Sequence, residues 1–422
     1  MGYKANISSN LINQLLRIVI GGATSIIVAR VLGPTGQGYI AYIILVFMLI
    51  GDFGHFGLNN STMYFKKRSA YDPNHLFNVN VTALGLIFLV ISALVLLLRS
   101  TGIALTGYNY LYVFGGLVFV ASDLFFTSLH SWYVGDERIL ESNRYIITVF
   151  LVKSALILIL WLAGFLTPLT FFGATVLGML LNALYLARHT GQKYTPAIDT
   201  RLLKAEFSYG GVLWLGAIFS FLYFRADQFM IKGMLGISDL GVYSIAVVLA
   251  ELLFLVPVSI NSALLGKLYN IDKPSLARGI MARTLKLTLY VSVALALVGI
   301  PLCLLIPAVY GQAYSGAVLS TMILLAGAVF ASVAKVAMQY FFTLGRPKVH
   351  LYSSLATLAV NVTLNFILIP RYGITGAAIA SAISYLGYGL FYIAMFRFRE
   401  GFSFRDMFQL TSEDLQALWK KA

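Results

Sequence analysis

The stretch FSFLYFRADQFMIKGMLG, residues Phe219 to Gly236, places an Arg and an Asp two positions apart inside an otherwise apolar run. Charged residues make up only 11% of the chain, whereas hydrophobic residues make up 59% of it. This hydrophobic share is far above that of soluble domains, so a protein core could not bury it all. The run that contains Arg225 and Asp227 is therefore predicted to cross a lipid bilayer.

Apolar runs of this kind recur along the chain, and each is close to the 20 or so residues that a spanning helix needs. We expect an all-α polytopic membrane protein with about 12 transmembrane helices. The predicted spans lie at about residues 10–31, 39–64, 77–98, 109–132, 144–164, 168–187, 208–231, 242–266, 284–307, 316–343, 350–369 and 375–396.

A polar connection, GQKYTPAIDTR at residues 191–201, divides these spans into two sets of six. We predict an N-terminal six-helix lobe at 1–195, a C-terminal six-helix lobe at 196–400 and a cytoplasmic tail at 401–422. Because each lobe has an even number of spans, both lobes enter the membrane from the same side. Their relation is then a parallel repeat about an axis along the membrane normal.

The positive charges are distributed unevenly between the two sides of this topology. With the N-terminus inside, 22 of the 30 Lys and Arg residues fall on inward ends and loops, and four fall on the outward side. Such a bias predicts that both termini are cytoplasmic. The net charge of +14 therefore reflects topology, which removes the argument for nucleic acid as a partner.

Glycine corners repeat at corresponding places in the two predicted lobes. VLGPTGQGYIA at residues 31–41 and MLGISDLGVYS at residues 234–244 each have a Leu-Gly pair followed by a glycine five residues after the first, at Gly38 and Gly241. RYGITGAAIA at 371–380 is a third Gly-rich corner. Either a repeated architecture or ordinary glycine and proline punctuation of short turns accounts for the pattern. In both cases the corners allow close packing of helices.

Ionisable residues inside the predicted spans are costly, so each one is a functional-site hypothesis. The cations come from both lobes, and because phosphate oxygens accept charge-assisted hydrogen bonds we interpret them as candidate binding residues for an anionic substrate. The acids and a histidine are candidates for ion coupling, and the alternative for the whole set is structural pairing inside the bundle. The candidate substrate-binding residues are Arg17, Lys153, Arg225 and Lys335, and the candidates for ion coupling or buried pairing are Asp52, His55, Asp123, Asp227 and Glu251.

Two pairs within this set have a predicted geometry. Arg225 and Asp227 are about 200° apart around a helix, so we expect them to face different surroundings. Asp52 and His55, in GDFGHFGLNNS, are predicted to share one helix face, where a carboxylate beside an imidazole could bind a proton. We assign no catalytic residue, metal site or cofactor, and expect at most coupling to H+ or Na+.

Four segments together resemble Wzx-type polysaccharide flippases, the polysaccharide transport family of the MATE-like MOP superfamily. They are IIVARVLGPTGQGYIAYI at 26–43, FGLNNSTMYFKKRS at 56–69, RADQFMIKGMLGISDLGVYSIA at 225–246 and IPRYGITGAAIASAISY at 369–385. The resemblance covers roughly residues 5 to 400 and depends on span number and corner positions taken together, and twelve spans differ from the fourteen of the lipid II flippase.

The resemblance implies a V-shaped pair of six-helix lobes in the bacterial inner membrane, around a partly cationic cavity. The expected activity is the alternating-access flipping of an undecaprenyl-pyrophosphate-linked oligosaccharide, an O-antigen or other polysaccharide repeat unit used in lipopolysaccharide biosynthesis. Membrane lipids, and polysaccharide polymerase and chain-length proteins, are further expected partners. The alternatives are a MATE-type multidrug or cation antiporter, whose substrates favour an acidic cavity, and a membrane-embedded glycan polymerase or ligase, which commonly has a large outward loop that this chain lacks.

Overall fold

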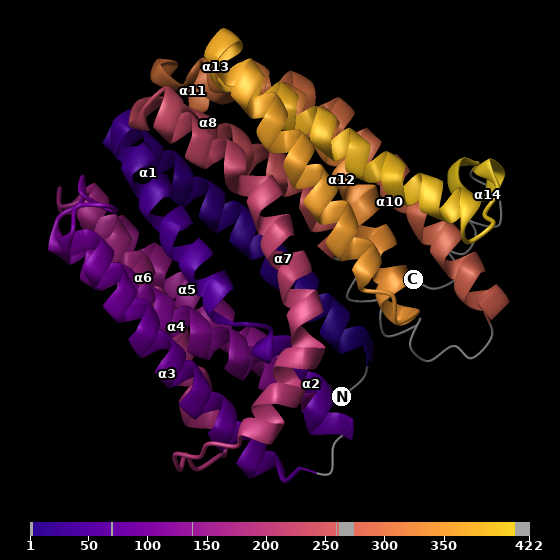
Figure 1. Ribbon diagram of the computed structural model, residues 1–422. Coiled ribbons are helices and arrows are strands. Elements are labelled where there is room, and N and C mark those ends of the chain that lie inside the picture. The colour runs from indigo at the N-terminus through magenta and orange to yellow at the C-terminus, as the bar shows by residue number, and fades with distance from the viewer. Residues whose placement is uncertain (1–2, 69–70, 137, 259, 261–273, 410–422) are drawn as a thin grey trace. The chain divides into compact units, whose positions relative to one another are not determined.

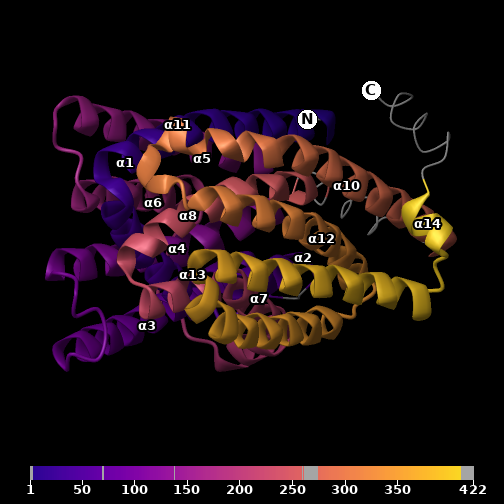
Figure 2. The ribbon, with the colours of Figure 1, turned by 90° about the horizontal axis from the view of Figure 1, so that it is seen from above.

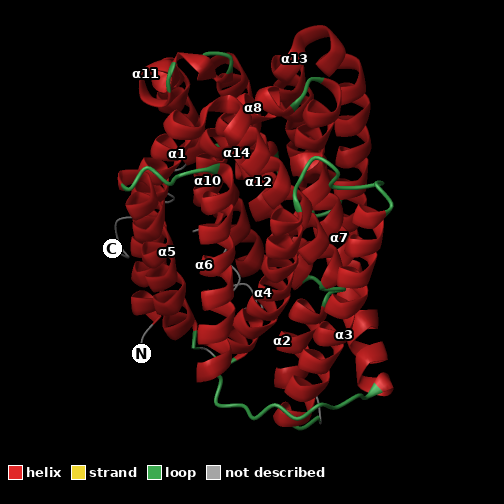
Figure 3. Cartoon of the chain, turned by 90° about the vertical axis from the view of Figure 1, so that its left-hand side faces the viewer, coloured by secondary structure: helices red, strands yellow, loops and turns green. Residues whose placement is uncertain are grey.

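The structure is a computed structural model that describes residues 3–68, 71–136, 138–258, 260 and 274–409. All the regular structure of these residues is helical, as Figure 3 shows. The helices of the first half are α1 (Tyr3–Gly54), α2 (Leu58–Arg68), α3 (Pro73–Ser100), α4 (Tyr110–Gly135), α5 (Ile139–Leu162) and α6 (Pro168–His189), and α7 (Thr200–Met234) follows. The later elements are α8 (Ile237–Glu251), η1 (Leu252–Phe254), α10 (Pro274–Leu302), η2 (Cys303–Leu305), α11 (Ile306–Tyr310), η3 (Gln312–Tyr314), α12 (Ala317–Thr343), α13 (Lys348–Phe398) and α14 (Phe404–Phe408).

Within the described residues, ten helices are long and apolar enough to cross a membrane. Two of them are bent hairpins, because α1 contains Gly33 at φ 63° and α13 contains Gly373 at φ 59°, where the backbone leaves the helical region. Such left-handed values suit glycine, which has no Cβ. Each hairpin supplies two spans, so the ten helices confirm the predicted all-α fold with about twelve spans.

The three predicted glycine corners are turns in the structure. Gly33 and Gly373 bend α1 and α13, and Gly236, at φ 119°, separates α7 from α8. Close packing follows in the third corner: a Cβ on Gly376 would collide with the Leu368 backbone carbonyl group in the other arm of α13. Alanine could not replace glycine there without moving the backbone.

The chain divides into two compact units, Met1–Phe221 and Leu222–Ala422. The boundary falls inside α7, because the first part of this long helix packs with the elements before it. The irregular segment at residues 190–199, between α6 and α7, coincides with the polar connection seen in the sequence. The assignment of six spans to each lobe, with a boundary near residue 195, stays a prediction.

In the first unit, α4 packs against α6, and α1 packs against α4 and α5. The main core cluster contains Ile43, Phe47, Leu117, Val120 and Phe172, all nearly inaccessible to solvent. Gly116 of α4 allows the Phe47 side chain of α1 to come very close, since a Cβ on Gly116 would overlap the Phe47 ring. Figure 1 shows α3, α4, α5 and α6 lying together beside α1.

In the second unit, α12 is the central helix and packs against α8, α10 and α13. Figure 2 shows α10, α12 and α13 running side by side. Small residues along α12, including Gly327, Ala331 and Ala334, let neighbouring backbones come close. A Cβ on Gly327 would lie only 2.6 Å from the Cα atom of Ala382 on α13.

The predicted second span at 39–64 is wrong in one respect, because it is not a continuous helix. The α1 helix ends at Gly54, and α2 begins at Leu58 after a turn in which Phe56 has φ 45° and Gly57 has φ 81°. A Cβ on Gly57 would lie 2.5 Å from the carbonyl oxygen of Gly210, so this glycine allows α7 to approach the turn. As a consequence, His55 lies in the turn and does not share a helix face with Asp52.

Candidate functional site

Arg225 is held by an acid from the next helix. Its guanidinium donates from Nη1 to Glu251 Oε1 at 2.6 Å and from Nη2 to Glu251 Oε2 at 3.0 Å. Both side chains are mostly covered, with 22% and 29% of their surface exposed. This two-point geometry is the strongest form of an Arg to carboxylate pair. The structure thus gives a protein partner to a residue that the sequence suggested as a ligand for phosphate.

The side chain of Asp227 contacts different residues of the second unit from those that Arg225 contacts. This agrees with the angle of about 200° predicted between the two side chains around the helix. The fully buried Tyr243 donates its hydroxyl to Asp227 Oδ2 at 2.6 Å, and Ser381 of α13 donates to the same oxygen at 2.8 Å. The backbone N–H of Gln228 donates to Oδ1 at 2.8 Å. Hydrogen-bond donors surround this carboxylate, which is 1% exposed.

A polar stripe on α13 extends from Asp227 into the hairpin. Asn361 donates to Ser381 Oγ at 3.2 Å across the two arms, and Asn365 donates to the Asn361 carbonyl and side-chain oxygens, both at 2.9 Å. All three side chains are fully buried. The sequence reasoning missed this stripe, although an Asn pair at i and i+4 within an apolar span was a usable signal.

Lys335 of α12 lies close to the same group of residues. Its Nζ is 4.3 Å from the centre of the Phe224 ring and 4.6 Å from that of Phe254, an arrangement that attracts a cation to the ring faces. It is also within electrostatic range of Arg225 and Glu251. Four of the predicted residues, Arg225, Asp227, Glu251 and Lys335, are therefore brought together in the second unit.

The remaining acids and the histidine gather in the first unit. The Nε2 atom of His55 is 3.6 Å from Asp123 Oδ2, and Asp52 is within electrostatic range of both residues. The ring nitrogens of His55 have no hydrogen-bond partner among the described residues, and the side chain is buried. Trp214 of α7 donates to the backbone carbonyl of Asp52 at 3.0 Å. The structure replaces the predicted helical pair with a three-residue cluster that includes α4.

Lys153 lies on α5, in the first unit. Its side chain packs against Gly178 of α6, where an added Cβ would lie 3.2 Å from Lys153 Cδ, and its Nζ is 5.7 Å from the centre of the Phe150 ring. The side chain of Arg17 lies outside the described residues. A shared site of the four predicted cations stays a prediction.

Glu206 is a buried acid that falls just outside the span predicted at 208–231. In the structure it is on α7 and is completely buried, with Oε1 accepting from Asn80 at 3.1 Å and from Ser61 at 3.2 Å. The missed signal was helical continuity: Thr200 to Met234 forms one helix, which begins well before the apolar run at 208.

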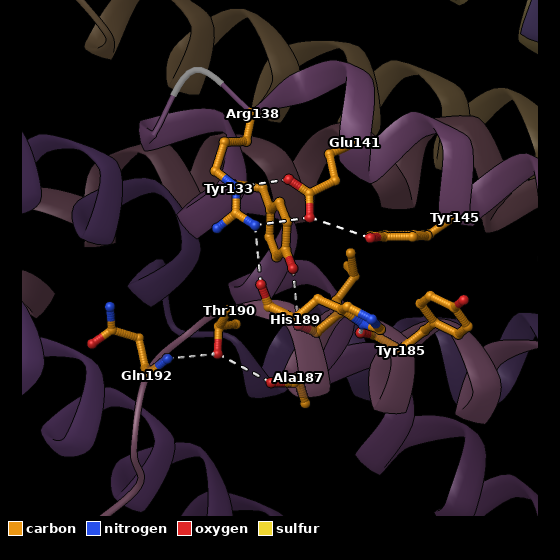
Figure 4. A network of polar contacts seen from close by, with 10 residues as sticks. Tyr133, Arg138, Glu141, Tyr145, Tyr185, Ala187, His189, Thr190 and Gln192 are labelled. Atoms are coloured by element: carbon orange, nitrogen blue, oxygen red, sulfur yellow. Dashed lines mark hydrogen bonds and ion pairs between the residues drawn. The ribbon is translucent and has the colours of Figure 1, made fainter.

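A polar network joins the ends of α4, α5 and α6 (Figure 4). Arg138 forms a two-point ion pair with Glu141, with both distances 2.8 Å, and also donates to the last-turn carbonyl oxygen of His189 at 3.0 Å. The hydrogen-bonded Glu141 carboxylate raises the pKa of Arg138. This arginine satisfies a helix C-terminus, where a cation is favoured.

The described residues contain no group of three or more His, Cys, Asp or Glu side chains placed to hold a metal ion. What the second unit holds instead is a network of paired charges and hydroxyls within helices that can cross a membrane. Paired intramembrane charges on packed helices are typical of transport proteins. The fold and this network define a polytopic membrane protein, and its buried, paired charges make it a candidate transport protein.

A family model described as "Polysaccharide biosynthesis protein" matches residues 3–265, and the chain belongs to that family. A second model, described as MatE, matches residues 213–367. A search of curated protein sequences found no match. The family match and the fold confirm the resemblance to a MOP-superfamily polysaccharide flippase.

Solved structures of transporters share this fold. The lipid II flippase MurJ in an inward closed conformation is 14% identical, with a TM-score of 0.68 over 99% of this chain and 92% of that one. An inward-facing multidrug resistance MATE family transporter of the MOP superfamily is 15% identical, with a TM-score of 0.66 over 99% of both chains. A MOP superfamily transporter from Pyrococcus furiosus is 16% identical, with a TM-score of 0.57 over 93% and 95%. At these identities the likeness is one of fold.

Proposed function

We propose that this protein flips an undecaprenyl-pyrophosphate-linked oligosaccharide across the bacterial inner membrane by alternating access, with both termini in the cytoplasm. The observation that carries the proposal is the match of the polysaccharide biosynthesis model to residues 3–265 of a chain that shares its fold with a lipid II flippase. A large polar headgroup cannot cross the hydrocarbon core unaided, which makes a protein pathway necessary.

The buried charges support the proposal in a modified form. The guanidinium of Arg225 is paired with Glu251, so a pyrophosphate would have to compete with this carboxylate for the guanidinium N–H donors. Lys335 lies beside the pair and adds a second positive charge. We propose that the Arg225 and Glu251 pair opens during transport and exposes the guanidinium to the anionic headgroup.

Ion coupling is part of the same proposal. A buried acid can bind a proton or a cation more tightly in one conformation of the protein than in the other. Such a difference in affinity can link an ion gradient to transport. Asp52, Asp227 and Glu251 are the acids we propose, and replacing at least one of them with its amide should reduce the response to an imposed proton or sodium gradient. Unchanged gradient dependence in all three variants would make these acids structural partners.

The direct test is flipping in reconstituted liposomes. A lipid-linked oligosaccharide placed in both leaflets is treated with a membrane-impermeant glycosidase, and the purified protein should make the inner-leaflet pool accessible. Empty liposomes and liposomes with an unrelated membrane protein are the controls. If the protein leaves the inner pool protected under every imposed gradient, the proposed substrate is wrong.

A MATE-type exporter is the second candidate, because the MatE model matches residues 213–367 and MATE transporters share the fold. Its substrates are expected to be organic cations. Uptake of a fluorescent organic cation by the same liposomes, without movement of the lipid-linked sugar, would favour this candidate.

A further inference from the structure

Glu206 occupies a completely buried position near the start of α7, between Ser61 of α2 and Asn80 of α3. The three side chains belong to the first compact unit and are at most 2% exposed. The helices approach closely here, since Gly57 and Gly210 leave no room for a Cβ on either residue. Water is therefore largely excluded from the carboxyl group.

The hydrogen-bond donors around Glu206 can be counted. Thr62 donates its hydroxyl proton to the Leu58 carbonyl at 2.6 Å, so its oxygen can accept one proton of the Asn80 amide at 2.9 Å. The other amide proton of Asn80 goes to Glu206 Oε1. Ser61 has one hydroxyl proton, which it directs to the Leu58 carbonyl at 3.0 Å or to Glu206 at 3.2 Å.

This count leaves two buried acceptors with no donor among the described residues. They are Glu206 Oε2 and Asn80 Oδ1. Acceptors without donors in a buried site are costly, and an ionised carboxylate there is more costly still. One additional proton on Glu206 Oε2 would remove the charge and create the missing donor at the same time.

Among the residues that the structure describes, no basic side chain forms an ion pair with Glu206. The titratable side chains of the helices packed against it are engaged elsewhere: Lys66 with Asp136 and the Trp132 ring, His75 with Asp199, and Tyr64 with the ring of Tyr209. The side chains of Lys67 and Arg68 lie outside the described residues.

A cation is a poorer solution than a proton at this place. Hard cations take several oxygen ligands, about six to eight for Ca²⁺, whereas Glu206 Oε2 and Asn80 Oδ1 are the two acceptors left over here. Nor do the described residues hold a cluster of three acids or other metal-ligating side chains.

We propose that Glu206 is a proton-binding site, in which Oε2 carries one proton and donates it to Asn80 Oδ1 when α7 is packed against α2 and α3. When this packing opens, water reaches the carboxyl group and accepts the proton. Binding of the proton thus favours the packed arrangement of the first part of α7. The inference does not depend on which lipid the protein carries.

The test uses the purified full chain in detergent and does not involve transport. Because the folded protein binds this proton more tightly than the unfolded chain, its stability falls as pH rises. The wild-type melting temperature should fall as the pH rises above about 4.3, the ordinary pKa of a glutamate and hence that of the unfolded chain, and it should level off once the folded protein has released the proton. Glu206→Gln, whose amide imitates the protonated acid, should lose most of that fall. Glu400→Gln, which changes an acid paired with Arg346, is the matched control and should keep the wild-type profile.

A second measurement observes the proton itself and needs no variant at position 206. The infrared band of a buried carboxylic acid should be present in the wild-type protein and should shift in heavy water. Asn80→Ala, which removes the acceptor, should move the band to higher frequency because its hydrogen bond is lost.

Two results would overturn the proposal. One is a pH profile that Glu206→Gln leaves unchanged, together with no carboxylic-acid band that responds to Asn80→Ala. The other is stabilisation of the wild type, but not of Glu206→Gln, by added Na+ at constant ionic strength, which would show a bound cation in place of the proton. Failure of lipid flipping alone would leave this inference standing, because neither measurement depends on transport.

Discussion

Arg225 and Glu251 hold each other by two hydrogen bonds on neighbouring helices, and each is about three-quarters covered. A charge left alone in such surroundings costs more than the pair itself contributes. Exchanging the two charges therefore distinguishes a structural role of Arg225 from a role in substrate binding, because only the structural role should be restored by the exchange.

We expect Arg225→Ala to destabilise the protein by about 2–4 kcal/mol, since Glu251 keeps its charge without a partner. The exchanged variant, Arg225→Glu with Glu251→Arg, should recover most of the lost stability. Thermal unfolding of the purified proteins measures both effects.

Transport then separates the two roles. Recovery of flipping in the exchanged variant would assign Arg225 to structure, whereas recovery of stability without flipping would support the proposed contact with pyrophosphate. Arg225→Lys should retain part of the activity, because a charge remains without the two-point fork. Full flipping by Arg225→Ala would contradict the binding role.

At the scale of the elements, α12 and α13 depend on glycine for their contact. Gly327 faces Ala382, with 2.6 Å between an added Cβ and the Ala382 Cα atom, while Gly387 of α13 faces open space. Both are within helices, so the intrinsic preference for alanine is the same at both.

We expect Gly327→Ala to destabilise the second unit by about 1–3 kcal/mol, because the helices must move apart. The matched change Gly387→Ala should be neutral or should stabilise by up to about 1 kcal/mol. Melting temperatures of the two variants provide the comparison, and equal shifts would show that α12 and α13 do not need this close approach.

The segment between α6 and α7 is an irregular element that α3 holds in place. Asn78 donates to Thr195 Oγ1 at 2.7 Å and accepts from the Thr195 N–H at 3.0 Å, and Thr82 accepts from the Ala197 N–H at 3.1 Å. These bonds satisfy backbone and side-chain groups that a flexible linker would leave to water.

Asn78→Ala should release this segment, at a cost of about 1–2 kcal/mol in local stability. A protease that cuts at Lys193 should then cleave roughly 5- to 30-fold faster, which follows from the same energy. Asn60→Ala, at an exposed position of α2, is the control. A cleavage rate equal to that of the wild type would mean that these hydrogen bonds do not order the segment.

At the scale of the whole molecule, the uneven distribution of Lys and Arg predicts which side of the membrane each loop occupies. Two exposed positions report on it: Thr101, between α3 and α4, and Lys193, between α6 and α7. The chain has one cysteine, Cys303, which is buried, so a cysteine-free background needs one substitution.

In a Cys303→Ala background, a cysteine at position 101 should react with a membrane-impermeant thiol reagent added to intact cells. A cysteine at position 193 should react only after the membrane is opened. The opposite pattern would invert the predicted topology and place both termini outside.

The sequence by itself determined the spans and the corners. The length of an apolar run sets whether a helix can cross the bilayer, and glycine at Gly33, Gly236 and Gly373 permits backbone angles that other residues avoid, so both features are local. The break between Asp52 and Leu58 was less visible, because it depends on the approach of Gly210 from a distant helix.

Only the tertiary structure decided the partners of the buried charges. The sequence marked Arg225, Asp227 and Glu251 as costly in a membrane, but it could not show that Arg225 faces Glu251 while Asp227 faces Tyr243 and Ser381. It also left Glu206 outside the predicted spans, although this residue is buried within α7. The free energy needed to bury a charged side chain depends on its own chemistry, which the sequence shows. The partner that offsets this free energy can lie 154 residues away, as Ser381 does from Asp227, and is determined by the packing of the helices.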